Sequence, residues 1–185
     1  MIYNFGKRIS ILGRKRYYEK KNRAIFARFP TCESLAAASY EEIENIIRPC
    51  GLYRTKAKSI KDACVMLLEE YGGVLPCDMD ELLKLPGVGR KIANLLLGDI
   101  YHMPAIVADT HMIRICGRFG MYPEKLKDPH KVEITMSELV EPDEQSDLCH
   151  RIVQFGRDVC SARSPKCAEC PIAHLCEKGR KNGYV

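Results

Sequence analysis

The chain has 185 residues, enough to bury a substantial core in one domain or two small ones. No apolar run approaches the roughly 18 residues of a membrane span, and basic residues interrupt the first stretch too early for a secretory signal. The net charge of +5 is uneven, because residues 1–23 contribute +7 and the remaining residues sum to −2. Binding of an acidic partner beyond residue 23 therefore requires a local patch.

Short helices joined by turns are predicted along the rest of the chain, which indicates an all-α fold. Apolar periodicity and turn residues predict helices over about 39–48, 56–71, 79–85, 90–100, 109–117, 129–140 and 144–156. Side chains suited to capping begin three of them: Ser39, Asp78 and Asp109. Only Ala105–Ala108 is a brief strand-like apolar run, and the tail from Cys160 is expected to be mostly loop.

A tight turn, Pro86-Gly87-Val88-Gly89, joins two predicted helices and is followed by Arg90. The glycines lack a Cβ, so the backbone can turn sharply and approach another molecule closely. The next helix begins with unpaired N–H groups at its positive dipole end, which suits a phosphate. Residues 86–90 are therefore predicted to bind the DNA backbone without reading its sequence. The alternative is a plain connection between helices, since such turns are common.

Two further side chains, one just after this turn and one later in the chain, are candidates for catalysis. Lys91 lies in the first turn of the following helix, where an amine beside a bound phosphate can reach a sugar carbon. Asp109 can serve as a catalytic carboxylate, as the cap of its helix, or as both. The alternative for Lys91 is an ordinary exposed lysine.

Four of the ten cysteines are crowded near the C-terminus: Cys160, Cys167, Cys170 and Cys176. Without a secretion signal a disulfide framework is not expected. Four thiols within 17 residues instead indicate one metal centre. Their spacing alone does not decide between zinc and an iron–sulfur cluster.

Taken together, these motifs resemble the endonuclease III family of helix-hairpin-helix DNA glycosylases. The matching segments are Leu85 to Lys91 with the hairpin, Val107 to His111 with the aspartate, Phe155 to Arg157, the four-cysteine loop, and Gly51-Leu52-Tyr53 before Lys56 and Lys58. The similarity runs from about residue 24 to about residue 178. The hairpin, the aspartate segment and the four-cysteine loop are three ordered motifs, and together they are far more specific than any one of them.

The resemblance implies a helix-hairpin-helix glycosylase fold with a C-terminal loop that carries a [4Fe–4S] cluster on the four cysteines. It implies damaged double-stranded DNA as the partner, with the damaged base flipped out of the duplex. Lys91 would attack the sugar C1′, expel the base and form a Schiff base, after which β-elimination cuts the strand. Asp109 would stabilise positive charge on the sugar.

The same resemblance implies oxidised pyrimidines and abasic sites as substrates. It also implies a monomer without membrane association, in the bacterial cytoplasm on the nucleoid. Two alternatives stay open: a DNA-binding iron–sulfur remnant with little or no catalysis, and a monofunctional glycosylase of the adenine type. The adenine-excising branch usually lacks the lysine, so Lys91 favours the lyase.

The beginning of the chain departs from the family pattern. Residues 1–23 form an atypical basic segment without the family's Ser-Ala-Gln motif, and the first glutamine of the chain is Gln145. We therefore expect a shortened or altered N-terminus, without the helices that normally precede residue 24, which would blunt base flipping. Residues 24–128 are expected to form a helical domain with the hairpin, and residues 129–185 to contribute helices and the cluster loop.

Overall fold

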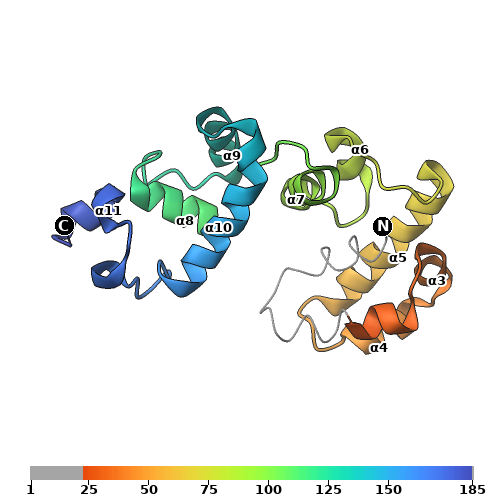
Figure 1. Ribbon diagram of the computed structural model, residues 1–185. Coiled ribbons are helices and arrows are strands. Elements are labelled where there is room, and N and C mark those ends of the chain that lie inside the picture. Colours follow the sequence, from red (N-terminus) through yellow and green to blue (C-terminus); the bar gives the residue numbers. More distant parts are fainter. Residues whose placement is uncertain (1–22, 185) are drawn as a thin grey trace. The chain divides into compact units, whose positions relative to one another are not determined.

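The computed structural model describes residues 23–184 (Figure 1). Within this range every regular element is a helix, and no helix is long and apolar enough to cross a membrane. The expectations for the basic N-terminal segment lie outside the described residues, apart from Arg23. The chain divides into two compact units, one ending at Leu96 and the other beginning at Leu97, and each is described by itself. The division expected from the sequence, at residues 23 and 128, stays a prediction.

The first unit is built on one long helix that two short helices cover. Its helices after residue 28 are α3 (Cys32–Ala37), α4 (Tyr40–Ile47), α5 (Tyr53–Tyr71), α6 (Met79–Lys84) and the first part of α7 (Arg90–Tyr101). Both α3 and α4 pack against α5 (Figure 1). Ser39 caps α4 as predicted, because its hydroxyl accepts the Glu42 N–H and the Glu42 carboxylate accepts the Ser39 N–H. Caps of this kind fix where each short helix begins.

The second unit is a helical cluster around a separate apolar core. It contains the end of α7, α8 (Thr110–Phe119), α9 (Pro129–Leu139), α10 (Gln145–Asp158) and α11 (Glu177–Lys181). Three short 3-10 helices interrupt the loops: η1 (Pro142–Glu144), η2 (Cys167–Glu169) and η3 (Ala173–Leu175). Met112, Cys116, Val132 and Met136 are almost completely buried in this core. Helix α8 packs against both α10 and α11, so it links the core to the C-terminal tail.

The strand-like run Ala105–Ala108 is an extended segment without a partner strand in residues 23–184. Ala105, Ile106 and Ala108 are buried, which explains the apolar pattern. The Val107 N–H donates to the Cys149 thiol over 3.2 Å, so a side chain of α10 replaces the strand partner. This contact anchors the chain just before Asp109.

Gly156 lets α10 approach α8 closely. A Cβ at this position would lie 2.8 Å from Cδ1 of Ile115 and would also collide with the ring of His111. Alanine is normally the better residue in a helix by about 1 kcal/mol. Here we expect Gly156→Ala to lower the free energy of unfolding by roughly 1–3 kcal/mol, because of overpacking. Urea denaturation measures this. Gly51→Ala, whose Cβ would meet nothing within 4 Å, serves as control. Equal stability of both variants would contradict the packing argument.

Candidate active site and cluster loop

The predicted hairpin connects α6 to α7 in the first unit. Gly87 has φ of +80°, a conformation that favours glycine. A Cβ on Gly87 would also lie 2.7 Å from Cβ of Ser59, so the turn packs tightly on α5. The Val88 N–H closes the turn onto the Leu85 carbonyl over 3.0 Å, and both of these side chains are buried. The hairpin is therefore a rigid part of the first unit.

Helix α7 begins immediately after this turn. The carbonyl of Gly89 accepts the N–H groups of Ile92 and Ala93 over 2.8 and 3.0 Å. The N–H groups of a helix's first turn have no intrahelical acceptor and form the positive end of its dipole. A Cβ at Gly89 would meet nothing within 4 Å, so the space beside the turn is open to another molecule. The geometry suits a phosphate oxygen.

Lys91 is exposed in this first turn of α7. Its neighbours Ile92 and Ala93 are buried, which fixes the Lys91 backbone on a packed helix. The Lys91 amine is thereby placed directly after the turn of residues 86–89, in the first turn of a helix, as the sequence predicts.

Asp109 caps α8 in the second unit. Its Oδ1 accepts the N–H groups of His111 and Met112 over 2.8 and 2.9 Å. Since Met112 is almost fully buried, the carboxylate is held by backbone that cannot move easily. For Oδ2 the structure records no hydrogen bond from residues 23–184, and the residue is half-buried. The capping prediction is confirmed, and one oxygen is left for another partner.

Leu52 is a feature that sequence reasoning missed. It precedes α5 with φ of +57°, and 80% of the residue is exposed. A leucine in the left-handed region is strained, and such strain often marks functional positions. The Gly51-Leu52-Tyr53 motif carries no local signal for this backbone conformation.

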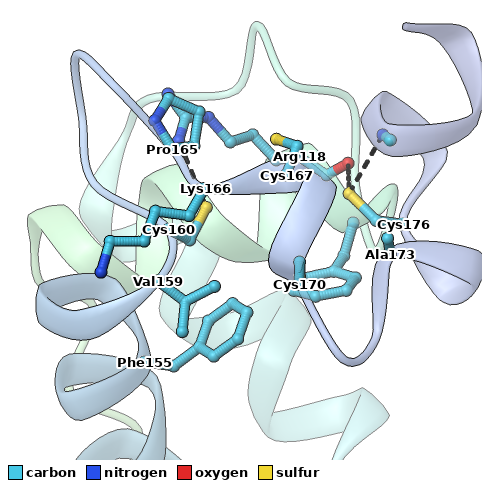
Figure 2. Close-up of a pocket in the computed structure, with 12 residues that line it drawn as sticks. Arg118, Phe155, Val159, Cys160, Pro165, Lys166, Cys167, Cys170, Ala173 and Cys176 are labelled. Atoms are coloured by element: carbon cyan, nitrogen blue, oxygen red, sulfur yellow. Dashed lines mark hydrogen bonds between the residues drawn. The ribbon is translucent and has the colours of Figure 1, made fainter. Parts of the chain in front are cut away.

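The four C-terminal cysteines line one pocket of about 350 Å³, counted with its open mouth. Figure 2 shows them around a shared space with Phe155 and Arg118. Burial and the nearby thiols of the other three cysteines raise the pKa of Cys167. The predicted ligand set is thus brought together, and none of the ten cysteines forms a disulfide.

The donor set suits an iron–sulfur cluster. All four thiols line the same pocket, and four cysteine thiolates are the usual ligands of a [4Fe–4S] cluster. Two N–H groups point at these sulfurs, from Arg118 to Cys160 over 3.2 Å and from Gly179 to Cys176 over 3.4 Å.

Two arginines of α8 tie this helix to the cluster loop. Arg114 Nη2 donates to the carbonyl of Cys160 over 3.0 Å, and Arg118 Nη1 donates to the carbonyl of Ser161 over 2.8 Å. Burial, and then the charge of Arg118, lower the pKa of Arg114. The spacing of four places both side chains on one helix face. One helix thus carries Asp109 at its start and contacts to the cluster loop at its end.

Two family models match the chain in the segments that carry these features. Residues 15–142 match the HhH-GPD superfamily of base excision DNA repair proteins, and residues 160–176 match the iron–sulfur binding domain of endonuclease III. The second match spans the four cysteines from the first to the last.

Curated relatives and solved structures agree with these matches. The chain is 42% identical to endonuclease III of Bacillus subtilis over 86% of this chain and 72% of the relative. It is 36% identical to endonuclease III of Escherichia coli over 86% of this chain and 76% of the relative. A trapped endonuclease III–DNA covalent intermediate matches with a TM-score of 0.88 and 38% identity, over 97% of this chain and 84% of that one. The chain belongs to the endonuclease III family.

This membership confirms several expectations from the sequence. The all-α helix-hairpin-helix glycosylase fold, the base excision repair function and the iron–sulfur cofactor are those of the family. The chain is a DNA glycosylase with abasic-site lyase activity, and neither the remnant nor the adenine-type alternative is favoured. A thermostable thymine-DNA glycosylase, with a TM-score of 0.85 and 23% identity, supports the fold alone.

Proposed function

We propose that this chain removes oxidised pyrimidines from duplex DNA and then cuts the strand, with Lys91 as the nucleophile. The observation that carries the proposal is the position of Lys91, exposed in the first turn of α7 directly after the rigid hairpin. The relative solved as a trapped covalent intermediate on DNA supports a covalent step. We further propose that the chain acts as a monomer on the nucleoid in the bacterial cytoplasm.

The hairpin residues Pro86 to Arg90 are proposed to hold the DNA backbone. The open space at Gly89 and the dipole of α7 favour a phosphate oxygen there. Such contacts position a duplex without reading its sequence, which suits a repair enzyme that acts at many sites. The exposed Arg90 adds positive charge.

Lys91 is proposed to attack C1′ of the damaged nucleotide as a neutral amine. The C1′–N bond breaks, the base leaves with the bonding electrons and takes up a proton, and the sugar ring opens to a Schiff base with the lysine. Loss of a C2′ proton then expels the 3′ phosphate by β-elimination. Water finally releases the sugar fragment and regenerates the amine.

Asp109 is proposed to stabilise positive charge on the sugar as the base departs. Its Oδ1 is committed to the helix N-terminus, which leaves Oδ2 for the substrate. A carboxylate fixed in advance by backbone donors needs no reorganisation during the reaction. Capping and catalysis are therefore compatible in this one residue.

Leu52 is proposed to enter the DNA stack when the base leaves it. Apolar side chains that enter a base stack stabilise such openings. Ser59 of α5 is the residue that contacts the hairpin, and Leu52 stands seven residues before it. The two residues are therefore about 10 Å apart along the helix axis. The same helix thus carries the exposed leucine and supports the phosphate-binding turn.

Leu52→Asn should weaken catalysis while leaving the fold intact. Asparagine tolerates the left-handed backbone but cannot replace the apolar contact with bases. We expect kcat/KM on lesion duplexes to fall about tenfold or more. The reason is that unstacking a base costs a few kcal/mol, and without the leucine part of this cost is no longer offset. Val74→Asn, which replaces another exposed apolar residue of the first unit, is the control. Equal kcat/KM in the two variants would remove Leu52 from this role.

The cluster is proposed to be held by Cys160, Cys167, Cys170 and Cys176. When bound, it supplies four strong iron–thiolate bonds that link η2, η3 and the end of α10. The chain's own residues carry out the chemistry on DNA.

A cleavage assay on defined duplexes tests the proposed function. We expect a duplex with one thymine glycol to lose the base and to be cut 3′ of the lesion, and a duplex with adenine opposite 8-oxoguanine to stay intact. Base release without strand cleavage would indicate a monofunctional enzyme. Absence of both, in a folded sample that contains iron, would favour the DNA-binding remnant.

A further inference from the structure

Arg118, near the end of α8, donates hydrogen bonds both to a sulfur of the cluster loop and to backbone carbonyls of that loop. Its Nη1 donates to Sγ of Cys160 over 3.2 Å and to the carbonyl of Ser161 over 2.8 Å. Its Nη2 donates to the carbonyl of Ala162 over 2.9 Å. One guanidinium thus holds a ligand sulfur and the two carbonyls that follow it (Figure 2 labels Arg118 and Cys160).

Arg118 has hydrogen bonds with two of the four cysteine sulfurs, and these two bonds respond differently when the thiols lose their protons to bind iron. The thiol of Cys176 donates to the Arg118 carbonyl over 3.4 Å, and that bond requires the proton. In the bond from Arg118 to Cys160 the sulfur is the acceptor, so it strengthens as the sulfur becomes a thiolate.

We infer that Arg118 is a positioning residue that sets the reduction potential and the retention of the cluster, an inference that rests on the proposed cysteine ligands. Hydrogen bonds to the sulfurs and nearby positive charge both stabilise the electron-rich state of an iron–sulfur cluster. The same bonds hold the first stretch of the loop, so the cluster stays enclosed. Buried surroundings strengthen the effect, because Nε of Arg118 is itself shielded from solvent.

The test compares Arg118→Gln with Arg163→Gln, which removes the same charge from an exposed position in the same loop. The midpoint potential is measured by voltammetry without DNA, and cluster retention by the decay of absorbance at about 400 nm in air. We expect Arg118→Gln to have a more negative potential and to lose the cluster about tenfold faster than wild type. Arg163→Gln should resemble wild type in both. Identical potential and decay in the two variants would overturn the inference.

Two further outcomes are distinguishable. Wild-type protein without this absorbance or iron would refute the cysteine ligands themselves, and the role of Arg118 with them.

If Arg118→Gln folds by circular dichroism but purifies without iron, the role of Arg118 in cluster retention is supported, and Arg118→Lys supplies the comparison. Lysine lacks the planar fork by which Nη1 and Nη2 of Arg118 reach the sulfur and the two carbonyls from separate atoms, so faster decay than wild type is expected. Wild-type decay in Arg118→Lys would show that charge alone suffices and would overturn the hydrogen-bond role.

Discussion

Lys91→Ala is expected to abolish covalent trapping of the protein on abasic-site DNA by borohydride. Without the amine no Schiff base forms, so there is nothing for the reductant to fix. The loss should be at least about a thousandfold, as for removal of other catalytic nucleophiles. The free energy of unfolding should change by no more than about 0.5 kcal/mol, because Lys91 is exposed. Gel separation of the adduct and urea denaturation measure the two effects.

Two further variants separate chemistry from charge. Lys91→Arg keeps a positive charge near the hairpin but replaces the amine by a guanidinium that stays protonated, so trapping should again be absent while DNA binding persists. Lys84→Ala removes another exposed lysine, at the end of α6, and should trap like wild type. Trapping by Lys91→Ala at the wild-type level would show that another amine is the nucleophile.

Asp109→Asn is expected to lower kcat by about a hundredfold or more while the protein stays folded. Asparagine caps a helix about as well as aspartate, so its oxygen can still accept the N–H groups of His111 and Met112. The substitution removes the negative charge that would face the sugar in the transition state. Loss of one electrostatic contact of this kind typically lowers kcat by about a hundredfold to a thousandfold. Single-turnover base release and urea denaturation measure the two quantities.

Asp109→Ala separates the two roles further, because it removes the cap as well. We expect it to lose about 1 kcal/mol more of stability than Asp109→Asn, with a similar loss of activity. Wild-type kcat in Asp109→Asn would mean that Asp109 is only a helix cap.

Local features of the fold were predictable from the sequence because their causes are local. The caps at Ser39, Asp78 and Asp109 satisfy N–H groups two or three residues away, so the pattern contains the interaction itself. The turn at Gly87 follows from a backbone conformation that favours glycine. The cysteine spacing likewise identified four side chains that line the same pocket.

Other features depend on partners far along the chain or leave no trace in it. Arg118 contacts Cys160 across 42 positions, a pairing that no periodicity encodes. Helix α5 begins at Tyr53 rather than near residue 56, and Leu52 before it provides no capping side chain that would have marked this start in the sequence. In the extended run Ala105–Ala108 the Val107 N–H donates to the thiol of Cys149, a contact that strand patterns do not anticipate. These contacts could be identified only from the folded structure.

The most direct test of the account is to trap the full chain on an abasic-site duplex with borohydride and to map the modified peptide by mass spectrometry. The account predicts an efficient adduct in which the DNA sugar is attached to Lys91. No adduct from folded, iron-containing protein, or an adduct on a different amine, would contradict it.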